Sequence, residues 1–448
     1  MNMPSLTDNL IMSGYLLLWV ITFIWYHRKS RHIDGGSTVI ASYIAYAVFS
    51  LFTLNDEIFV VTYEPLRLFP FLYLYMMLII ALSPAIKMHN SEVTQIEDPH
   101  STSLYIPCII LVLCVIAQIP NMLSNFSSGI FALLTDTDAG KDAYLEQASE
   151  ADNAGSSIGN APSLIFNMLY DCVVFLFFYY LTRRDKSRIF AIVLSVSIFT
   201  GMILPVANGQ RGSVIKAVLT IVCGYMIFRQ FLSARINLWI GRIGIIASII
   251  VAVPIIAITT SRFSDRTNGT DVGGYVYWYL GQENLYFNNS ALDAGGIRYG
   301  DRTANLFKRT IISGTPKNYV ERRDKYKNLK IDDFWFVTFV GDFTLDYGPI
   351  GALLIFIVFN AWALTMIKPR DGTIKLHQLL LVYFTLCICI QGGMTLFSYS
   401  DTGNLIIIIF ALLYAWLRYH EALLSRFPLL ISDENKGTAV NSRKEMIC

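Results

Sequence analysis

The sequence predicts an all-α polytopic integral membrane protein with about eleven transmembrane helices. Hydrophobic residues occupy 54% of the 448 positions and charged residues only 15%, a balance that soluble chains of this length do not have. The apolar residues also collect in runs of about 17 to 21, and a helix of that length crosses the hydrocarbon core of a bilayer. The net charge of +2 says little about binding partners, because the meaning of each charge depends on the side of the membrane on which it lies.

Eleven apolar runs follow one another along the chain, and each predicts one span. The first lacks a basic leader and a small-residue cleavage site, so we expect it to remain in the protein as a helix. The spans are expected near residues 9–26, 37–54, 65–83, 103–121, 163–182, 189–207, 213–228, 243–260, 349–367, 377–396 and 403–419.

Basic residues in the short connections predict the orientation. They follow the first, fifth, seventh and ninth spans, so they all fall on one side of the membrane, which should be the cytoplasmic side. The N-terminus is then external and the C-terminal tail cytoplasmic. Long loops are exempt from this charge rule, so the basic segment 261–348 can be external.

The chain therefore divides into four parts. An eight-span bundle, 1–260, carries an external acidic loop at 122–162, and a three-span part, 349–419, precedes the tail 420–448. The large loop between them, 261–348, is the longest segment that cannot lie in a membrane, and it holds twelve Lys and Arg together with many acidic and aromatic residues. We expect this loop to form the roof of an active site.

Histidine and cysteine are absent from the expected external loops. All six histidines map to the cytoplasmic side or its edge, and the cysteines lie in expected spans or at the end of the tail. The external face thus lacks the imidazole and thiolate ligands of a zinc site, and we expect no metal and no other cofactor. Chemistry on that face would rest on arginines, carboxylates and tyrosines.

Arg211 stands at a short external turn between two expected spans, beside Gly209 and Gly212. An unpaired charge at membrane level is costly, so an arginine in this place is a functional candidate. Glycines let a large anion approach the backbone, and a guanidinium offers a fork of donors that suits a diphosphate. The alternative is an arginine that reaches up to lipid phosphates. Arg67 and Lys216 admit the same two interpretations.

Six short motifs resemble the oligosaccharide repeat-unit polymerases, the Wzy or O-antigen polymerase family, and the likeness covers most of the chain. What carries the resemblance is their order on a many-span scaffold. The motifs are Asn-Gly-Gln-Arg-Gly at 208–212, Ser-Arg-Phe at 261–263, Tyr-Leu-Gly-Gln-Glu at 279–283, Phe-Asn-Asn at 287–289, Gly-Asp-Arg-Thr at 300–303 and Phe-Val-Gly-Asp-Phe-Thr-Leu-Asp-Tyr-Gly at 339–348.

The resemblance implies a metal-independent glycosyltransferase on a GT-C-like scaffold in the bacterial inner membrane. Such an enzyme joins oligosaccharide repeat units carried on undecaprenyl diphosphate at the periplasmic face. An acceptor hydroxyl attacks the anomeric carbon of the donor glycan, and the lipid diphosphate leaves. The implied partners are the lipid-linked glycan donor and acceptor and membrane lipids, with a chain-length regulator and a flippase as further candidates and no nucleic acid.

The motif positions assign roles to candidate residues. Arginines would bind the diphosphate and stabilise its departure: Arg211, Arg262 and Arg302, with Arg298 and Arg67 in support. The base for the acceptor hydroxyl, if one is needed, would be a carboxylate: Glu283, Asp301, Asp342 or Asp346. Sugar rings and hydroxyls would be bound by aromatic and amide side chains: Trp278, Tyr279, Asn288 and Asn289.

Other interpretations stay open. The aromatic segment 333–340 is also typical of an interfacial belt, and 322–327 of a solvated or lipid-facing helix turn. A ligase of lipid-linked glycan would use the same donor, but that family is expected to place a histidine in its outer loop. A glycan flippase or other transporter would have polar or broken helices in mid-membrane and no large external loop.

Overall fold

The computed structural model describes residues 4–29, 33–56, 59, 63–99, 103–114, 116–117, 161–183, 188–207, 211–246, 272–317, 319–395 and 401–424. The elements in these ranges are helices, apart from one small two-stranded sheet. The expected acidic loop 122–162 and the tail lie almost entirely outside the described residues.

Within the described ranges, seven helices are long and apolar enough to cross a membrane. They are α1 (Leu6–Lys29), α2 (Gly35–Leu54), α3 (Leu68–Asn90), α6 (Ala161–Thr182), α8 (Arg211–Phe228), α13 (Thr338–Met366) and α15 (Asp401–Leu424). Three shorter apolar stretches are also helical: Ser103–Cys114, most of α7 (Arg188–Ala207) and α14 (Leu376–Gln391). Each of these helices overlaps one expected span. The expected span 243–260 lies mostly outside the described residues.

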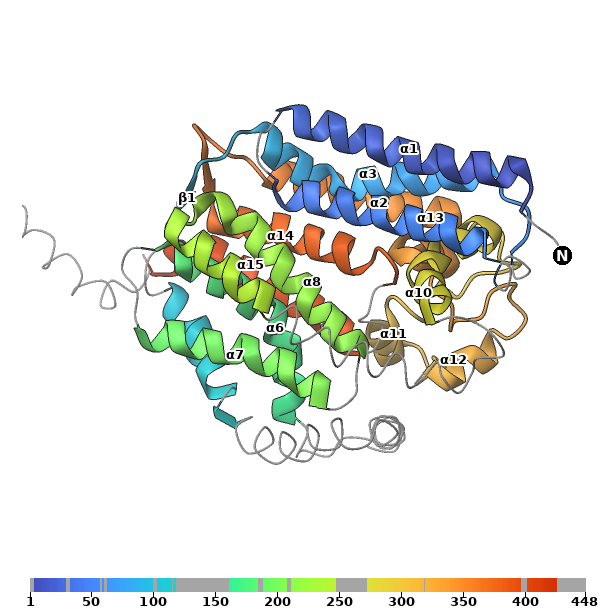
Figure 1. The fold of residues 1–448 in the computed structure, drawn as a ribbon. Helices are drawn as coiled ribbons and strands as arrows, with labels where there is room; N and C mark the ends of the chain where they lie inside the picture. The colour runs from blue at the N-terminus through green and yellow to red at the C-terminus, as the bar shows by residue number, and fades with distance from the viewer. Residues whose placement is uncertain are drawn as a thin grey trace, which may run out of the picture.

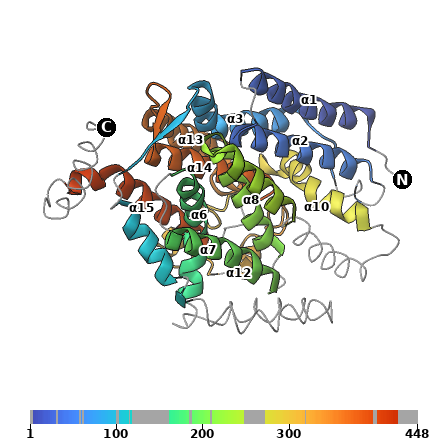
Figure 2. The same cartoon turned by 60° about the vertical axis from the view of Figure 1, so that its left-hand side comes forward.

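Helix α14 is the centre of the bundle. It packs against α3, α8 and α15, and α1–α3 and α6–α8 lie on different sides of it (Figures 1 and 2). Most of its residues are buried, including Tyr383 and Cys387. A helix that is apolar on all sides is expected to be covered on all sides, and the sequence of α14 has this character.

Helix α10 (Val272–Tyr286) belongs to the large loop but packs lengthwise against α2. A Cβ atom at Gly281 would lie 2.4 Å from the backbone carbon of Phe49, so only glycine allows this approach. Hydroxyl groups of α2 complete the contact: Ser50 donates to the Gly281 carbonyl, and Thr53 to the Tyr277 carbonyl, both at 2.8 Å. The expected roof is thus partly embedded beside a candidate span.

Helix α13 changes direction at Gly348, where φ is +72°. Glycine adopts this angle without a Cβ clash, and Pro349 lacks the N–H that would continue the helical ladder. The end of the large loop therefore forms a helical segment of its own, from Thr338 to Tyr347. The membrane part follows the break, and the expected span began at 349.

The remaining elements lie at the two ends of the bundle (Figure 1). One end carries α10, the π-helix η4 (Phe287–Ala291), α11 (Asn305–Ile311) and α12 (Tyr319–Lys325). At the other end, β1 (Gln95–Glu97) pairs in parallel with β2 (Thr373–Lys375), and η3 (Arg229–Phe231) follows α8. The first of these two ends is the one that the orientation prediction makes external.

Candidate functional site

A buried network of charged side chains joins the large loop to α13. Arg302 Nη1 lies 3.0 Å from Asp333 Oδ1, and its Nε lies 3.1 Å from Asp342 Oδ1. Arg298 pairs with Asp333 and, at 2.9 Å, with Asp346. None of these side chains is more than 8% exposed. The structure thus brings together four of the predicted site residues: Arg298, Arg302, Asp342 and Asp346.

Asp333 is the hub of this network, and the sequence did not single it out. It contacts three guanidiniums, the third being Arg322, whose Nε donates to Oδ2 at 2.6 Å. Burial raises the pKa of Asp333, but the Arg302, Arg298 and Arg322 charges outweigh it and hold the pKa well below its usual range. The interfacial belt expected at 333–340 concerned the aromatic residues and did not foresee that Asp333 is buried among arginines.

The local backbone explains how the arginines reach α13. Gly300, with φ +80°, turns the chain after Arg298, whose N–H donates to the Leu345 carbonyl at 2.8 Å. Asp346 Oδ2 then accepts from the Thr303 N–H and hydroxyl, both at 2.7 Å. The 298–303 turn is in this way fixed along the first segment of α13.

Asp301 points away from this network and has partners of its own. Lys308 pairs with it, and Lys325 Nζ and the Tyr326 hydroxyl donate to Oδ2 at 2.7 Å each. Burial raises the pKa of Asp301, but these three hydrogen bonds outweigh it, so that the pKa is lowered. The expectation of a solvated or lipid-facing turn at 322–327 is therefore wrong for Arg322, which is buried. Lys325 is exposed as expected, although it also donates to Asp301.

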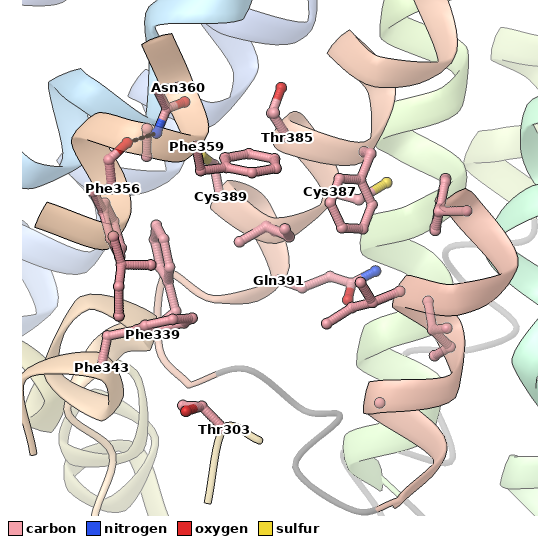
Figure 3. A pocket seen from close by; sticks show the side chains of 18 of the residues that line it. Thr303, Phe339, Phe343, Phe356, Phe359, Asn360, Thr385, Cys387, Cys389 and Gln391 are labelled. Atoms are coloured by element: carbon pink, nitrogen blue, oxygen red, sulfur yellow. Dashed lines mark hydrogen bonds between the residues drawn. The ribbon is translucent and has the colours of Figure 1, made fainter. Parts of the chain in front are cut away.

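An apolar cavity of about 260 Å³ lies next to the charged network, between α13, α14 and α15. Figure 3 shows aromatic side chains of α13, among them Phe343 and Phe356, across from Gln391 of α14, with Thr303 at one end. Ile355 and Ile407 also line the cavity and are exposed on the outside of the bundle. The cavity is thus bounded by lipid-facing helices on one side and by the large loop at its end.

A second polar group lies at membrane depth beside the cavity. Asp171 of α6 lines the cavity, and its carboxylate lies 3.9 Å from Lys216 of α8. The Thr220 hydroxyl lies 3.3 Å from Asp171 Oδ1 and accepts from the Gln391 amide at 2.7 Å. Ionisable residues in such a place are costly to bury and mark functional candidates. The sequence predicted Lys216 as a candidate but not Asp171.

Glu283 lies apart from both groups, on the α10 side that faces α1 and α2. Its Oε1 accepts from the Asn284 amide at 3.2 Å, and its Oε2 has no hydrogen-bond partner among the described residues. Complete burial raises the pKa of Glu283 well above its usual range. Its charge is sensed by Tyr15 of α1 and Tyr46 of α2. Among the described residues, Glu283 has no hydrogen bond or ion pair to the charged network.

Asn288 and Asn289 use their amides on the backbone. The Asn288 side chain accepts from the Arg67 N–H at 2.9 Å and donates to the Arg67 carbonyl at 2.7 Å. The Asn289 side chain likewise accepts from the Glu64 N–H at 3.0 Å and donates to the Glu64 carbonyl at 3.1 Å. These bonds fix the segment before α3 against η4 and leave the Arg67 side chain exposed. Both amides thus have a structural role where the sequence suggested sugar binding.

The other candidates are found in separate places. Trp278 contacts Trp335 of the loop and Phe59 between α2 and α3, and Tyr279 contacts Phe336 of the loop, so both take part in aromatic packing. Arg211 is the first residue of α8, but its side chain lies outside the described part of the chain, and Arg262 lies outside it altogether.

Comparison with known proteins gives no relative for this chain. No family model matches it, and no match is found among curated proteins or solved structures.

Proposed function

We propose that this protein is a polymerase of surface polysaccharide, which joins oligosaccharide repeat units carried on undecaprenyl diphosphate at the periplasmic face of the bacterial inner membrane. One observation supports this most directly. Thr303 lies on the wall of an apolar cavity and directly follows Arg302 of the charged network. A lipid with an apolar chain and a charged, sugar-bearing head needs these two environments side by side.

The reaction is a glycosyl transfer. An acceptor sugar hydroxyl forms a bond to the anomeric carbon of the donor, the bond from that carbon to the diphosphate breaks, and the electron pair leaves with the lipid diphosphate. The main requirement is for cations where this negative charge develops. Arg302 and Arg298 are the described candidates, with Arg211 and Arg262 proposed from the sequence.

The proton of the acceptor hydroxyl needs an acceptor in turn. Asp342 and Asp346 of α13 contact the arginines directly, at 3.1 Å from Arg302 and 2.9 Å from Arg298 respectively. Asp301, one residue from Arg302, is held by two lysines and a tyrosine, and the lowered pKa makes it a weak base. We therefore propose Asp342 or Asp346 for this role ahead of Asp301.

The test is the surface glycan of a strain that lacks this protein and is otherwise intact. The expected product is lipid-linked or surface glycan that stops at one repeat unit, with long chains restored by the parent gene. A strain that still makes the full ladder of chain lengths contradicts the proposal.

A second candidate function is a transporter of lipid-linked glycan. The Asp171–Lys216 pair and the break at Gly348 favour it, because transporters place polar groups and interrupted helices at membrane depth. The same deletion strain separates the two functions. Loss of a flippase stops export and leaves no surface glycan, whereas loss of a polymerase leaves single units on the surface.

A further inference from the structure

The short helix α11 (Asn305–Ile311) has an exposed apolar side. Phe307 and Ile311 are four positions apart and therefore share one side of the helix. They are 39% and 83% exposed, and the next residue, Ile312, is 51% exposed. Clustered apolar side chains of this size indicate a surface that contacts lipid or protein.

Two membrane helices fix the position of α11 relative to the membrane edge. The Leu306 N–H donates to Asn404 Oδ1, and the Asn404 amide donates to the Thr303 carbonyl, both at 2.9 Å. Asn404 stands in the first turn of α15, at the edge of a candidate span. Asp346, close to the start of the membrane part of α13, holds the Thr303 N–H. Helix α11 therefore starts at the membrane edge, and its seven residues extend only about 10 Å from there.

The surroundings of this side resemble a membrane interface. Arg309 stands beside the apolar residues in the last turn of α11, whereas its neighbour Lys308 is bound to Asp301. A basic residue next to an apolar side is typical of helices that lie in the headgroup region. Ile407 and Ile408 are exposed on α15 one turn beyond Asn404. The apolar side of α11 thus continues the lipid-facing surface of a span.

We propose that α11 is an interfacial anchor, in which Phe307, Ile311 and Ile312 insert into the boundary between headgroups and acyl chains of the adjoining lipid leaflet. The inference does not depend on glycosyl transfer. The anchor nevertheless affects the candidate functional site, because Thr303, just before α11, lines the cavity. The anchor would hold the mouth of the cavity at a constant height relative to the lipids.

The experiment places a nitroxide label at position 311 of the full chain, as Ile311→Cys, in nanodiscs of phosphatidylcholine and phosphatidylglycerol. Collisions with oxygen, which concentrates in lipid, are compared with collisions with a water-soluble nickel chelate. The matched control is Lys327→Cys, since the Lys327 side chain is 69% exposed and carries only an i, i+3 ion pair to Asp324 among the contacts described. Both carry Cys448→Ser, and the parent without an introduced cysteine gives the background.

Oxygen collisions should exceed nickel collisions several-fold at 311, and the order should reverse at 327. Nickel collisions as frequent at 311 as at 327 would place α11 in water and overturn the proposal. Protection from both reagents would mean that protein covers this side, either a second copy or a partner, and would also overturn it. A second variant, Ile311→Asp with the label at 312, should move that label toward water; an unchanged ratio would contradict lipid insertion.

Discussion

Arg302 and Asp342 lie opposite each other at the junction of the large loop and α13, with 3.1 Å between Nε and Oδ1 and almost no solvent exposure. Forty residues separate them in the chain, so the pair closes most of the described loop onto the membrane bundle. A buried pair of this kind costs desolvation, and its strongest effect appears when one partner is removed and the other is left uncompensated. Substitutions in this pair can therefore separate a structural role of Arg302 from a catalytic one.

Arg302→Met should lower the free energy of unfolding by about 3–5 kcal/mol, because buried Asp342 loses the guanidinium 3.1 Å away and Arg298, at 3.7 Å, replaces it only in part. The double variant Arg302→Met/Asp342→Asn restores the balance of charge and should recover most of that loss. Thermal unfolding of the purified variants measures both. The double variant lacks both the proposed cation Arg302 and one proposed base, Asp342, so its glycan ladder should remain short, with polymerisation slowed about a hundredfold.

The matched control is Lys327→Ala, on an exposed position beside the same loop. It should leave both stability and ladder unchanged. Lys325→Ala is not a suitable control, because Lys325 donates to Asp301. A full ladder from a stable double variant would show that Arg302 is needed only for folding.

The stability of the loop should depend on pH through Asp333. Its folded-state pKa is lowered below the ordinary 3.8, so the stabilisation it provides is complete above that pH and is lost as the pH falls below it. Melting temperature should be nearly constant from pH 7 to 5 and fall below about pH 4. Asp333→Asn should melt lower at pH 7 and show a shallower acid dependence. An acid dependence equal to that of the parent would mean that other carboxylates control it.

Glu283 should have the opposite effect on the pH dependence of stability. Its folded-state pKa is raised, so the folded form holds a proton that the unfolded chain releases, and stability falls as pH rises above the ordinary value of 4.5. Glu283→Gln keeps the shape and removes the titration. It should raise the melting temperature at pH 8 more than at pH 5, and it should leave the glycan ladder intact if Glu283 is not the base. Loss of the ladder in this stable variant would return Glu283 to the candidate bases.

Asn289→Ala should destabilise the protein by about 1–3 kcal/mol, since it leaves the N–H and carbonyl of Glu64 without their partner. Asn289→Asp keeps the acceptor and loses the donor, and it should fall between the parent and the alanine variant. Unfolding in denaturant gives both values. Unchanged stability together with altered affinity for glycan would support the sugar-binding role instead.

Polymerisation by the purified protein should survive chelators. The expected external loops contain no histidine or cysteine, and no group of three or more metal-binding side chains occurs in the part of the chain that the structure describes. The assay is the glycan ladder with and without EDTA. Abolition by EDTA and rescue by a divalent cation would point to Asp342 and Asp346 as ligands.

The helices were predictable because the signal for each one is local. Apolar run length placed α1 or α15 without reference to the rest of the chain. The embedding of α10 was not predictable, because the space that admits Gly281 is made by α2, more than 200 residues away.

The candidate site was predictable only in part. Motif order grouped Arg302 with Asp342 and Asp346, and the structure brings these residues together. Asp333 was missed because the aromatic residues beside it favoured an interfacial belt, and its three arginine partners come from other parts of the loop. Asn288 was assigned to sugars because an amide offers the same donor and acceptor to a glycan as to a backbone.

The balance of charge in the buried network has one more consequence. Three guanidiniums, from Arg298, Arg302 and Arg322, face three carboxylates, so a distant anion senses little net attraction from this centre. A diphosphate can bind these arginines only by displacing a carboxylate from them, which is an exchange of one anion for another. The displaced aspartate must then move to water or take up a proton, so that anion binding at this centre would be coupled to proton uptake.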